Sequence, residues 1–286
     1  IKEGDAVFVP DFTFFASAEV VSFEGATPVF VDVDERTFNL DPDQLEKAIA
    51  VVKQQGKLRP RAVVAVDLFG QPADYERIEA ICKEHGLLLL EDGAQGFGGS
   101  IGERRACSFG DAATTSFFLA KPLGCYGDGG AVFTNDDQLD ELLRSLRVHG
   151  KSPVSKYDNV RIGVNSRLDT LQAAVLGVKL DAFASYELES VNRAAQMYSE
   201  YLGEATKTPV VPEGFGSSWA QYTILLKDEA QRQKVQHALK EQGIPTMVYY
   251  PKPMHLQGAF DQLEQPVACP VTESLCQRVV SLPMHP

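Results

Sequence analysis

Between residues 5 and about 135, short apolar runs alternate with stretches whose apolar residues recur at helical spacing. This alternation constrains the fold more than any other feature of the chain. Short apolar runs are typical of parallel strands that are buried on both faces. Their alternation with helices predicts an α/β fold, a largely parallel sheet with helices on both sides. The predicted strands are 6–9, 27–31, 62–66, 87–90, 112–117 and 131–134, and the predicted helices are 14–24, 41–54, 74–85 and 136–148.

The pattern changes after this first sheet. A polar loop at 151–157 precedes a long helical region from 168 to about 202, and the proline-rich segment 250–255 predicts another loop. We therefore expect two domains: a large domain at 1–185 and a smaller α+β domain at 186–286. In the second domain we predict strands at 219–226 and 246–249 and a helix at 228–242.

Composition excludes several functional classes. The chain has 286 residues, 44% of them hydrophobic, enough to bury a sizeable core. Its 27 basic and 39 acidic residues give a net charge of −12 without a basic stripe, which argues against nucleic acid as a partner. No run approaches the length of a membrane span, and Ile1–Asp5 has no signal-peptide character, so we expect a soluble cytoplasmic protein with no membrane partner. The five cysteines are scattered and read as reduced thiols, and the histidines predict no metal site.

One lysine stands out chemically. Lys121 follows the apolar segment 117–120 and precedes a glycine-rich stretch, where a strand should give way to a tight loop. A lysine that is desolvated there loses its proton more easily and becomes a nucleophilic amine able to form a Schiff base. The alternative is an ordinary surface lysine at a strand end.

An acid at the end of another strand strengthens the catalytic hypothesis. The apolar run 87–90 ends in Glu91 and Asp92, and ligands of open α/β sheets bind beyond the carboxyl ends of such strands. Pyridoxal 5'-phosphate requires a Schiff-base lysine and an anion beside its pyridinium nitrogen. Lys121 and Asp92 together therefore predict a pyridoxal phosphate site. The alternative for Asp92 is a cap on the following helix or turn.

Three further features carry a resemblance to a known family: the spacing Asp92-x-x-Gln95, Ser116 before Lys121, and the segment Asn165-Ser166-Arg167-Leu168-Asp169. With them the chain resembles the DegT-type nucleotide-sugar aminotransferases over essentially its whole length. These are fold-type I pyridoxal phosphate enzymes that act as homodimers. The resemblance implies a mostly parallel, seven-stranded-type sheet flanked by helices, and active sites shared between two subunits.

The same resemblance assigns roles around the cofactor. Lys121 would form the Schiff base and then move the proton between donor and cofactor carbons, and Asp92 would bind the pyridinium nitrogen. Gln95 would lie beside the ring and its phenolic oxygen. All three roles are expectations of the resemblance.

Three more residues would complete the cofactor site. Phe14 would stack on the ring, Ser116 would donate to the phosphate, and Asn165 would reach a phosphate in the other subunit's site. By sequence alone, Phe14 is more typical of a core aromatic and Asn165 of a turn residue, so these two roles rest mainly on the resemblance.

Substrate contacts follow from the family pattern as well. Arg167 would pair with a carboxylate of the glutamate donor or of a sugar acid, because guanidinium binds carboxylate in a bidentate manner. The alternative is a structural ion pair, with Asp169 for example. Tyr250 is expected at the sugar site, although the family often has His-Tyr-Pro where this chain has Tyr-Tyr-Pro at 249–251. His255 and Gln257 are the remaining substrate candidates.

The segments 121–130, 161–174 and 281–286 are most similar to enzymes that aminate C3 of UDP-2-acetamido-2-deoxy-3-oxo-glucuronate with glutamate, for lipopolysaccharide and other surface polysaccharides. The alternatives are a C4 aminotransferase of a 4-keto-6-deoxy sugar nucleotide and a catalytically idle homologue that binds pyridoxal phosphate. A related dehydratase branch has histidine in place of the lysine, so Lys121 argues against it. A nicotinamide-dependent enzyme is disfavoured because no G-x-G-x-x-G follows a predicted strand.

The chain departs from the family at both ends. Family members have a segment before the point where Ile1 falls, with a Gly-Thr-Asp motif that cradles the cofactor phosphate, and a final helix after the point where Pro286 falls. The resemblance thus implies that the N-terminal part of the large domain and the last helix of the small one are missing from this sequence. A protein that truly began at Ile1 would bind the cofactor weakly.

Overall fold

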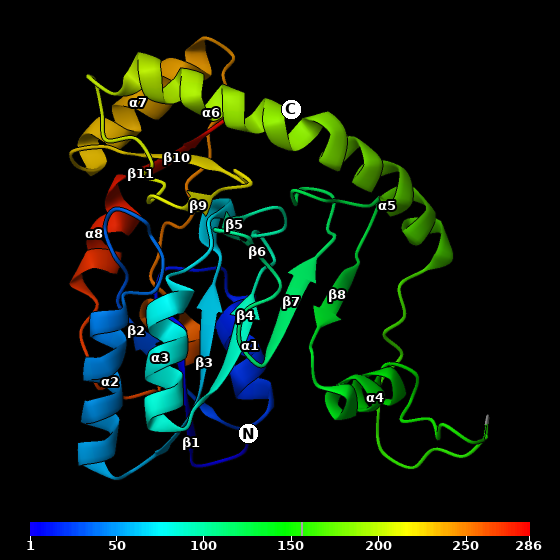
Figure 1. Ribbon diagram of the computed structural model, residues 1–286. Coiled ribbons are helices and arrows are strands. Elements are labelled where there is room, and N and C mark those ends of the chain that lie inside the picture. The colour runs from blue at the N-terminus through cyan, green and yellow to red at the C-terminus, as the bar shows by residue number, and fades with distance from the viewer. Residues whose placement is uncertain (156) are drawn as a thin grey trace.

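A six-stranded sheet lies at the centre of the computed structural model, which describes residues 1–155 and 157–286 (Figure 1). Its neighbouring strands are parallel except for the last pair, which is antiparallel. The predicted α/β fold with a largely parallel sheet is confirmed. Residue 156, within the loop predicted at 151–157, lies outside the described residues. The strand order is β2 (Thr27–Val31), β1 (Asp5–Pro10), β3 (Arg59–Val66), β4 (Leu88–Asp92), β7 (Ala112–Ser116) and β8 (Gly130–Phe133).

Helices cover both faces of this sheet. Helix α1 (Ala16–Phe23) lies behind it in Figure 1, and helices α2 (Pro42–Gln55) and α3 (Tyr75–His85) lie in front. Successive side chains of a strand point to opposite faces, so β1 contributes to two cores. Val7 and Val9 belong to the core shared with α1, whereas Ala6 and Phe8 belong to the core shared with α2 and α3.

Helix α2 illustrates how local sequence sets an element's bounds. Asp41 caps its start, because the side chain accepts hydrogen bonds from the backbone N–H groups of Asp43 (2.8 Å) and Gln44 (3.4 Å). Pro42 follows at the first helical position, where its missing N–H costs nothing. Gly56 ends the helix at a φ of 63°, a left-handed conformation that glycine adopts without strain.

A long helical stretch follows the sheet. Helix α4 (Asp137–Leu146) follows β8 and lies below the end of that strand in Figure 1. Helix α5 (Thr170–Ala182) continues through a π-helical turn (Phe183–Glu187) into α6 (Leu188–Leu202). This stretch agrees with the helical region predicted from 168 to about 202. The proposed division at 185 falls inside this stretch, which would then run from one domain into the other. No helix of the described chain is both long and apolar enough to cross a bilayer.

The C-terminal part is an α+β unit, but its strands differ from those predicted. The prediction of a strand at 246–249 was wrong: Met247 forms an isolated bridge to Ser281, and the chain then turns into a segment containing Pro251 and Pro253, which lack N–H donors. The strand predicted at 219–226 is shorter because Trp219 has a φ of 52°. The observed elements are β9 (Phe215–Gly216), β10 (Tyr222–Leu225), α7 (Glu229–Glu241), α8 (Pro270–Arg278) and β11 (Val279–Leu282). The two-residue strand β9 pairs with β5 (Ser100–Ile101) of the N-terminal part, which also pairs with β6 (Arg104–Arg105).

Each of the four strands β1 to β4 leads into an aspartate at the same edge of the sheet. Asp11, Asp32 and Asp67 directly follow β1, β2 and β3, and Asp92 ends β4. The first three side chains are almost completely buried, and Asp92 is half-buried. Since a buried carboxylate must be hydrogen-bonded or paired, the surroundings of these four groups determine what this edge can do.

Asp32 joins the first half of the chain to the last. Its carboxylate accepts hydrogen bonds from the backbone N–H groups of Val271 (2.9 Å) and Thr272 (2.8 Å), and from the Thr272 hydroxyl (2.9 Å). These N–H groups belong to the first turn of α8, and the residue at the N-cap position of that helix, Cys269, makes no side-chain cap. Asp32 therefore caps a helix that lies 240 residues further along the chain.

We expect Asp32→Ala to lower the free energy of unfolding by about 2 to 4 kcal/mol, because it leaves buried donors of α8 without an acceptor. Asp41→Ala is the matched control: it removes the half-exposed cap of α2 and should cost about 1 kcal/mol. Urea denaturation of both variants measures the two losses. Equal losses would show that Asp32 is no more than an ordinary helix cap.

Candidate active site

The structure brings the predicted lysine and aspartate to one edge of the sheet. Asp92 ends β4 and Ser116 ends the neighbouring strand β7, and Lys121 lies in the turn that follows β7. Lys121 is half-buried, and burial lowers the pKa of its ammonium group, while the nearby Asp92 carboxylate opposes this shift. A partly desolvated amine next to an anion fits a nucleophilic lysine better than it fits an ordinary surface lysine.

Asp92 is held in place by two hydrogen bonds. Its Oδ2 accepts from the Ser17 hydroxyl (2.7 Å), and its Oδ1 accepts from the backbone N–H of Ala94 (3.2 Å). The Ser17 hydroxyl also lies 3.1 Å from that of Thr13. Sequence reasoning missed Ser17, because a serine within a helix carries no local signal of a contact 75 residues away. One oxygen of Asp92 thus caps the turn after β4, as the alternative for this residue predicted, while the other oxygen is held by Ser17.

Gln95 and Tyr250 form a second fixed pair beside Asp92. The Gln95 amide donates to the Tyr250 hydroxyl (3.0 Å), and its carbonyl oxygen accepts from the backbone N–H of Phe69 (2.7 Å). Burial raises the pKa of the Tyr250 phenol, so this group stays neutral. The two residues are 155 positions apart, and this contact joins the loop that carries Tyr250, in the proline-rich segment 250–255, to the end of β4.

Phe14 lies at the same place. Its ring centroid is 6.3 Å from that of Tyr250, and the residue is 55% exposed. The alternative that Phe14 is a core aromatic therefore fails, because a core side chain would be covered by the protein. The adjacent Phe12, at 1% exposed, occupies the core instead. An uncovered ring beside Tyr250 is available to a planar ligand.

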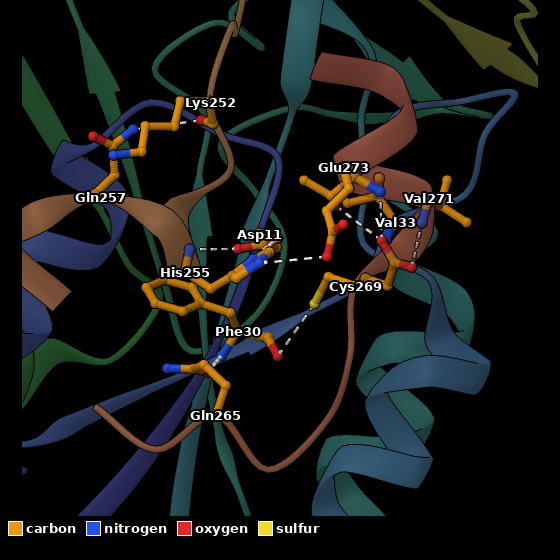
Figure 2. A network of polar contacts seen from close by, with 12 residues as sticks. Asp11, Phe30, Val33, Lys252, His255, Gln257, Gln265, Cys269, Val271 and Glu273 are labelled. Atoms are coloured by element: carbon orange, nitrogen blue, oxygen red, sulfur yellow. Dashed lines mark hydrogen bonds and ion pairs between the residues drawn. The ribbon is translucent and has the colours of Figure 1, made fainter. Parts of the chain in front are cut away.

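His255, a predicted substrate residue, is engaged within the protein. Its Nδ1 lies 2.6 Å from Asp11 Oδ2, its backbone N–H donates to Asp11 Oδ1 (2.8 Å), and its Nε2 lies 3.6 Å from Glu273 (Figure 2). Burial raises the pKa of Asp11, and His255 opposes this shift. The pair fastens the loop that carries Tyr250 to the end of β1. Gln257 lies apart from this network in Figure 2, and its amide donates to the Lys252 carbonyl oxygen (3.4 Å).

Asp11, His255 and Cys269 each place one atom capable of binding a metal within 4.8 Å of the others. Their polar atoms already have partners: the histidine is paired with Asp11, and the Cys269 thiol lies 3.9 Å from the Phe30 carbonyl oxygen, to which it donates. Burial also raises the pKa of this thiol, which opposes the thiolate form that metals bind. The arrangement is that of a hydrogen-bonded aspartate–histidine pair with a neutral thiol beside it.

The three remaining predicted residues have fewer contacts. The Ser116 hydroxyl accepts from the backbone N–H of Phe118 (3.2 Å) at the turn that leads to Lys121. Asn165 is exposed and forms an isolated bridge with Val148, in the segment between α4 and α5. Arg167 is exposed in the same segment. Neither Asn165 nor Arg167 is held by a built cluster like that around Asp92.

The residues around Asp92 fit pyridoxal phosphate. Lys121 supplies an amine whose pKa is lowered, Asp92 supplies an oriented anion, and Phe14 supplies an uncovered ring. Gln95 and Tyr250 add hydrogen-bonding groups in fixed positions. These are the groups that this cofactor requires of a protein, apart from the partners of its phosphate.

Comparison with known proteins agrees with this geometry. Residues 1–286 match the sequence model of the DegT/DnrJ/EryC1/StrS aminotransferase family. The UDP-2-acetamido-2-deoxy-3-oxo-D-glucuronate aminotransferase of Pseudomonas aeruginosa is 44% identical over 287 residues, which cover 100% of this chain and 76% of that protein. The UDP-N-acetyl-3-dehydro-alpha-D-glucosamine 3-aminotransferase of Acidithiobacillus ferrooxidans is 42% identical over 287 residues, covering 100% of this chain and 74% of that protein.

A solved structure is similar over the same range. The crystal structure of a DegT DnrJ EryC1 StrS aminotransferase from Brucella abortus has a TM-score of 0.96 and 50% sequence identity, and the match covers 100% of this chain and 75% of that one. Aminotransferases of this family depend on pyridoxal phosphate. The chain, an enzyme of the transferase class, belongs to the DegT/DnrJ/EryC1/StrS aminotransferase family.

Proposed function

We propose that the enzyme transfers an amino group from glutamate to C3 of UDP-2-acetamido-2-deoxy-3-oxo-glucuronate or a close relative, releasing 2-oxoglutarate. The half-buried Lys121 amine beside the oriented Asp92 carboxylate is the observation that carries the reaction type. The names of the Pseudomonas and Acidithiobacillus relatives, which both refer to position 3 of a UDP-linked sugar, support the acceptor.

Each residue of the site would have a defined task. Bound pyridoxal phosphate supplies an electron-withdrawing ring that stabilises negative charge on the substrate carbon. Lys121 holds and moves the proton at that carbon, since its amine is neutral more readily than that of an exposed lysine. Asp92 would face the ring nitrogen, with Ser17 and the Ala94 N–H fixing the orientation of its carboxyl group.

Other side chains would orient the reactants. Gln95 would lie beside the cofactor ring, Phe14 would stack on that ring, and Tyr250, held by Gln95, would contact the sugar. Ser116 would donate to the cofactor phosphate. Arg167 would bind a carboxylate of glutamate or of the uronic acid, because its exposed guanidinium is free to rotate onto one. His255 would act by holding the Tyr250 loop, with Gln257 further along that loop.

We also propose that two copies of the chain share their active sites, with Asn165 reaching the phosphate in the partner's site. Support comes from the exposed apolar residues around Asn165: Ile162 is 95% exposed, Val164 59% and Leu171 82%. Apolar side chains that gather on a surface in this way mark an interface.

The amino sugar would serve surface polysaccharides such as lipopolysaccharide or capsule. We place the enzyme in the cytoplasm, where a reducing environment suits its five cysteines, all of which are buried free thiols.

Lys121→Ala should abolish covalent attachment of pyridoxal phosphate and all amino transfer, because no other group replaces the amine. Incubation with the cofactor, reduction with borohydride and mass spectrometry of the peptides locate the attachment. Lys234→Ala, which removes an exposed lysine of α7, is the control and should keep both properties. Attachment that persists in Lys121→Ala would show that another lysine is the nucleophile.

Three acceptors would separate the proposed substrate from its alternatives: the 3-oxo-glucuronate nucleotide, the same sugar without its C6 carboxylate, and a 4-keto-6-deoxy sugar nucleotide. We expect kcat/KM to fall at least about tenfold when the carboxylate is removed, since a charged hydrogen-bonded pair is lost. Preference for the 4-keto sugar would instead favour a C4 aminotransferase. Covalent attachment without turnover of any acceptor would favour the idle homologue.

Mixing two inactive variants would test the shared site. Lys121→Ala and Asn165→Ala should each be nearly inactive, yet a mixture that is unfolded and refolded together should recover about a quarter of the wild-type activity, because half of the dimers then hold one intact site. Mixtures that stay inactive would place Asn165 in the same site as the Lys121 of its own chain.

A further inference from the structure

Two carboxyl groups are buried side by side behind the site. Asp67, just after β3, and Glu91, in β4, are both 0% exposed. Their strands are neighbours, with Ala65 opposite Glu91 and Val66 opposite Asp92. Arg104 acts on Glu91 electrostatically but forms its salt bridge with Glu79 instead. Two negative charges in this position would repel each other without water or a cation to stabilise them.

The hydrogen bonds of the two groups differ. Both oxygens of Glu91 accept backbone N–H groups, Oε1 from Cys107 and Oε2 from Phe109 (2.8 Å). On Asp67, Oδ1 accepts from the Tyr75 hydroxyl (2.8 Å) and the Ala73 N–H (3.2 Å). Asp67 Oδ2 is buried and has no donor within the described chain. An oxygen without a donor is costly as a carboxylate, but it is satisfied if it carries a proton itself.

We infer that Asp67 is a neutral carboxylic acid that donates its Oδ2 proton to the Glu91 carboxylate, and that this pair positions the loop carrying Asp92 and Gln95. The choice of proton holder follows from the donors: Glu91 has N–H groups on both oxygens and is the natural anion, whereas Oδ2 of Asp67 has none.

The surroundings agree with this assignment. Burial and the neighbouring Glu91 raise the pKa of Asp67 well above its usual value, against the opposing effect of Tyr75 and Ala73. Burial raises the pKa of Glu91 as well, but the backbone N–H groups of Cys107 and Phe109 oppose that shift by favouring the carboxylate. Burial also raises the pKa of Tyr75 and brings that of the Cys107 thiol to about 12, so both stay neutral. Asp92 and Arg104 are the other charged groups that act on this cluster.

Asp67 contacts the segment that carries Asp92 and Gln95 directly. Its backbone N–H donates to the Asp92 carbonyl oxygen (3.0 Å). Its carboxyl packs so closely on Gly96, next to Gln95, that a Cβ at that position would clash with Oδ2. A negative charge on Asp67, in addition to that on Glu91, would therefore destabilise the position of the segment that carries Asp92 and Gln95. The proton assignment stands without the proposed function, whereas the positioning role rests on it.

The pH dependence of stability tests the proton. Because the folded-state pKa of Asp67 lies above its unfolded value, the folded chain binds an extra proton between the two values, and stability is lost as pH rises through the folded pKa. Asp67→Asn keeps a donor towards Glu91 and has no proton to lose. Its urea midpoint should therefore fall less between about pH 6 and about pH 9 than that of the wild type or of Asp261→Asn, an exposed control. Equal falls would overturn the inference.

A second variant tests which group holds the proton. Glu91→Gln places an amide NH₂ against backbone N–H donors, so its urea midpoint at neutral pH should lie below that of Asp67→Asn. The reverse order would assign the proton to Glu91 instead.

Two further measurements do not depend on that comparison. The infrared spectrum of folded wild-type protein at neutral pH should contain the C=O stretch of a protonated carboxylic acid, which vanishes on unfolding; its absence would overturn the inference even if a variant failed to fold.

For the positioning role, Asp67→Ala should bind pyridoxal phosphate about tenfold more weakly, with affinity restored in Asp67→Asn. Wild-type affinity in Asp67→Ala would refute positioning alone, and a wild type that fails to attach the cofactor would refute the proposed function instead.

Discussion

Four parallel strands end at one edge of the sheet, and each brings an aspartate there. Burial of these groups is the constraint on which the rest of the structure depends, because each carboxyl must be satisfied within the protein. The four solutions differ. Asp11 is paired with His255, Asp32 caps helix α8, Asp67 faces Glu91, and Asp92 is held by Ser17. The first two fasten C-terminal segments onto the sheet, and the last leaves a charge directed towards Lys121.

The elements around the first sheet could be predicted from sequence because their signals are local. A buried strand such as β2 is a short apolar run, and α2 begins with a capping aspartate followed by proline. The strand at 246–249 could not be judged in this way. Whether an apolar run forms a strand depends on its pairing partner. Here Met247 forms only an isolated bridge with Ser281, and the prolines that follow prevent further pairing. The left-handed backbone at Trp219 is likewise invisible in a propensity pattern.

In the candidate site, too, the features with a local sequence signal could be predicted, and those that depend on a distant partner could not. Lys121 and Asp92 each follow a strand on the same sheet edge, so sequence predicts that they lie close together, and they do. Ser17 and the partner of His255 could not be foreseen, since these contacts join residues 75 and 244 positions apart. Phe14 shows a third case: its residue type favours the core, but Phe12 fills that place and Phe14 is left uncovered.

The cap that Asp32 places on α8 also bears on how the protein is made. Its donors in α8 are 240 residues away, so a growing polypeptide that emerges from the ribosome contains an aspartate whose partners in that helix have not yet been synthesised. Contacts of such long sequence separation close late and slow folding. The sheet edge should therefore remain incomplete during translation, and we expect nascent chains of this enzyme to depend on chaperones until α8 has left the exit tunnel.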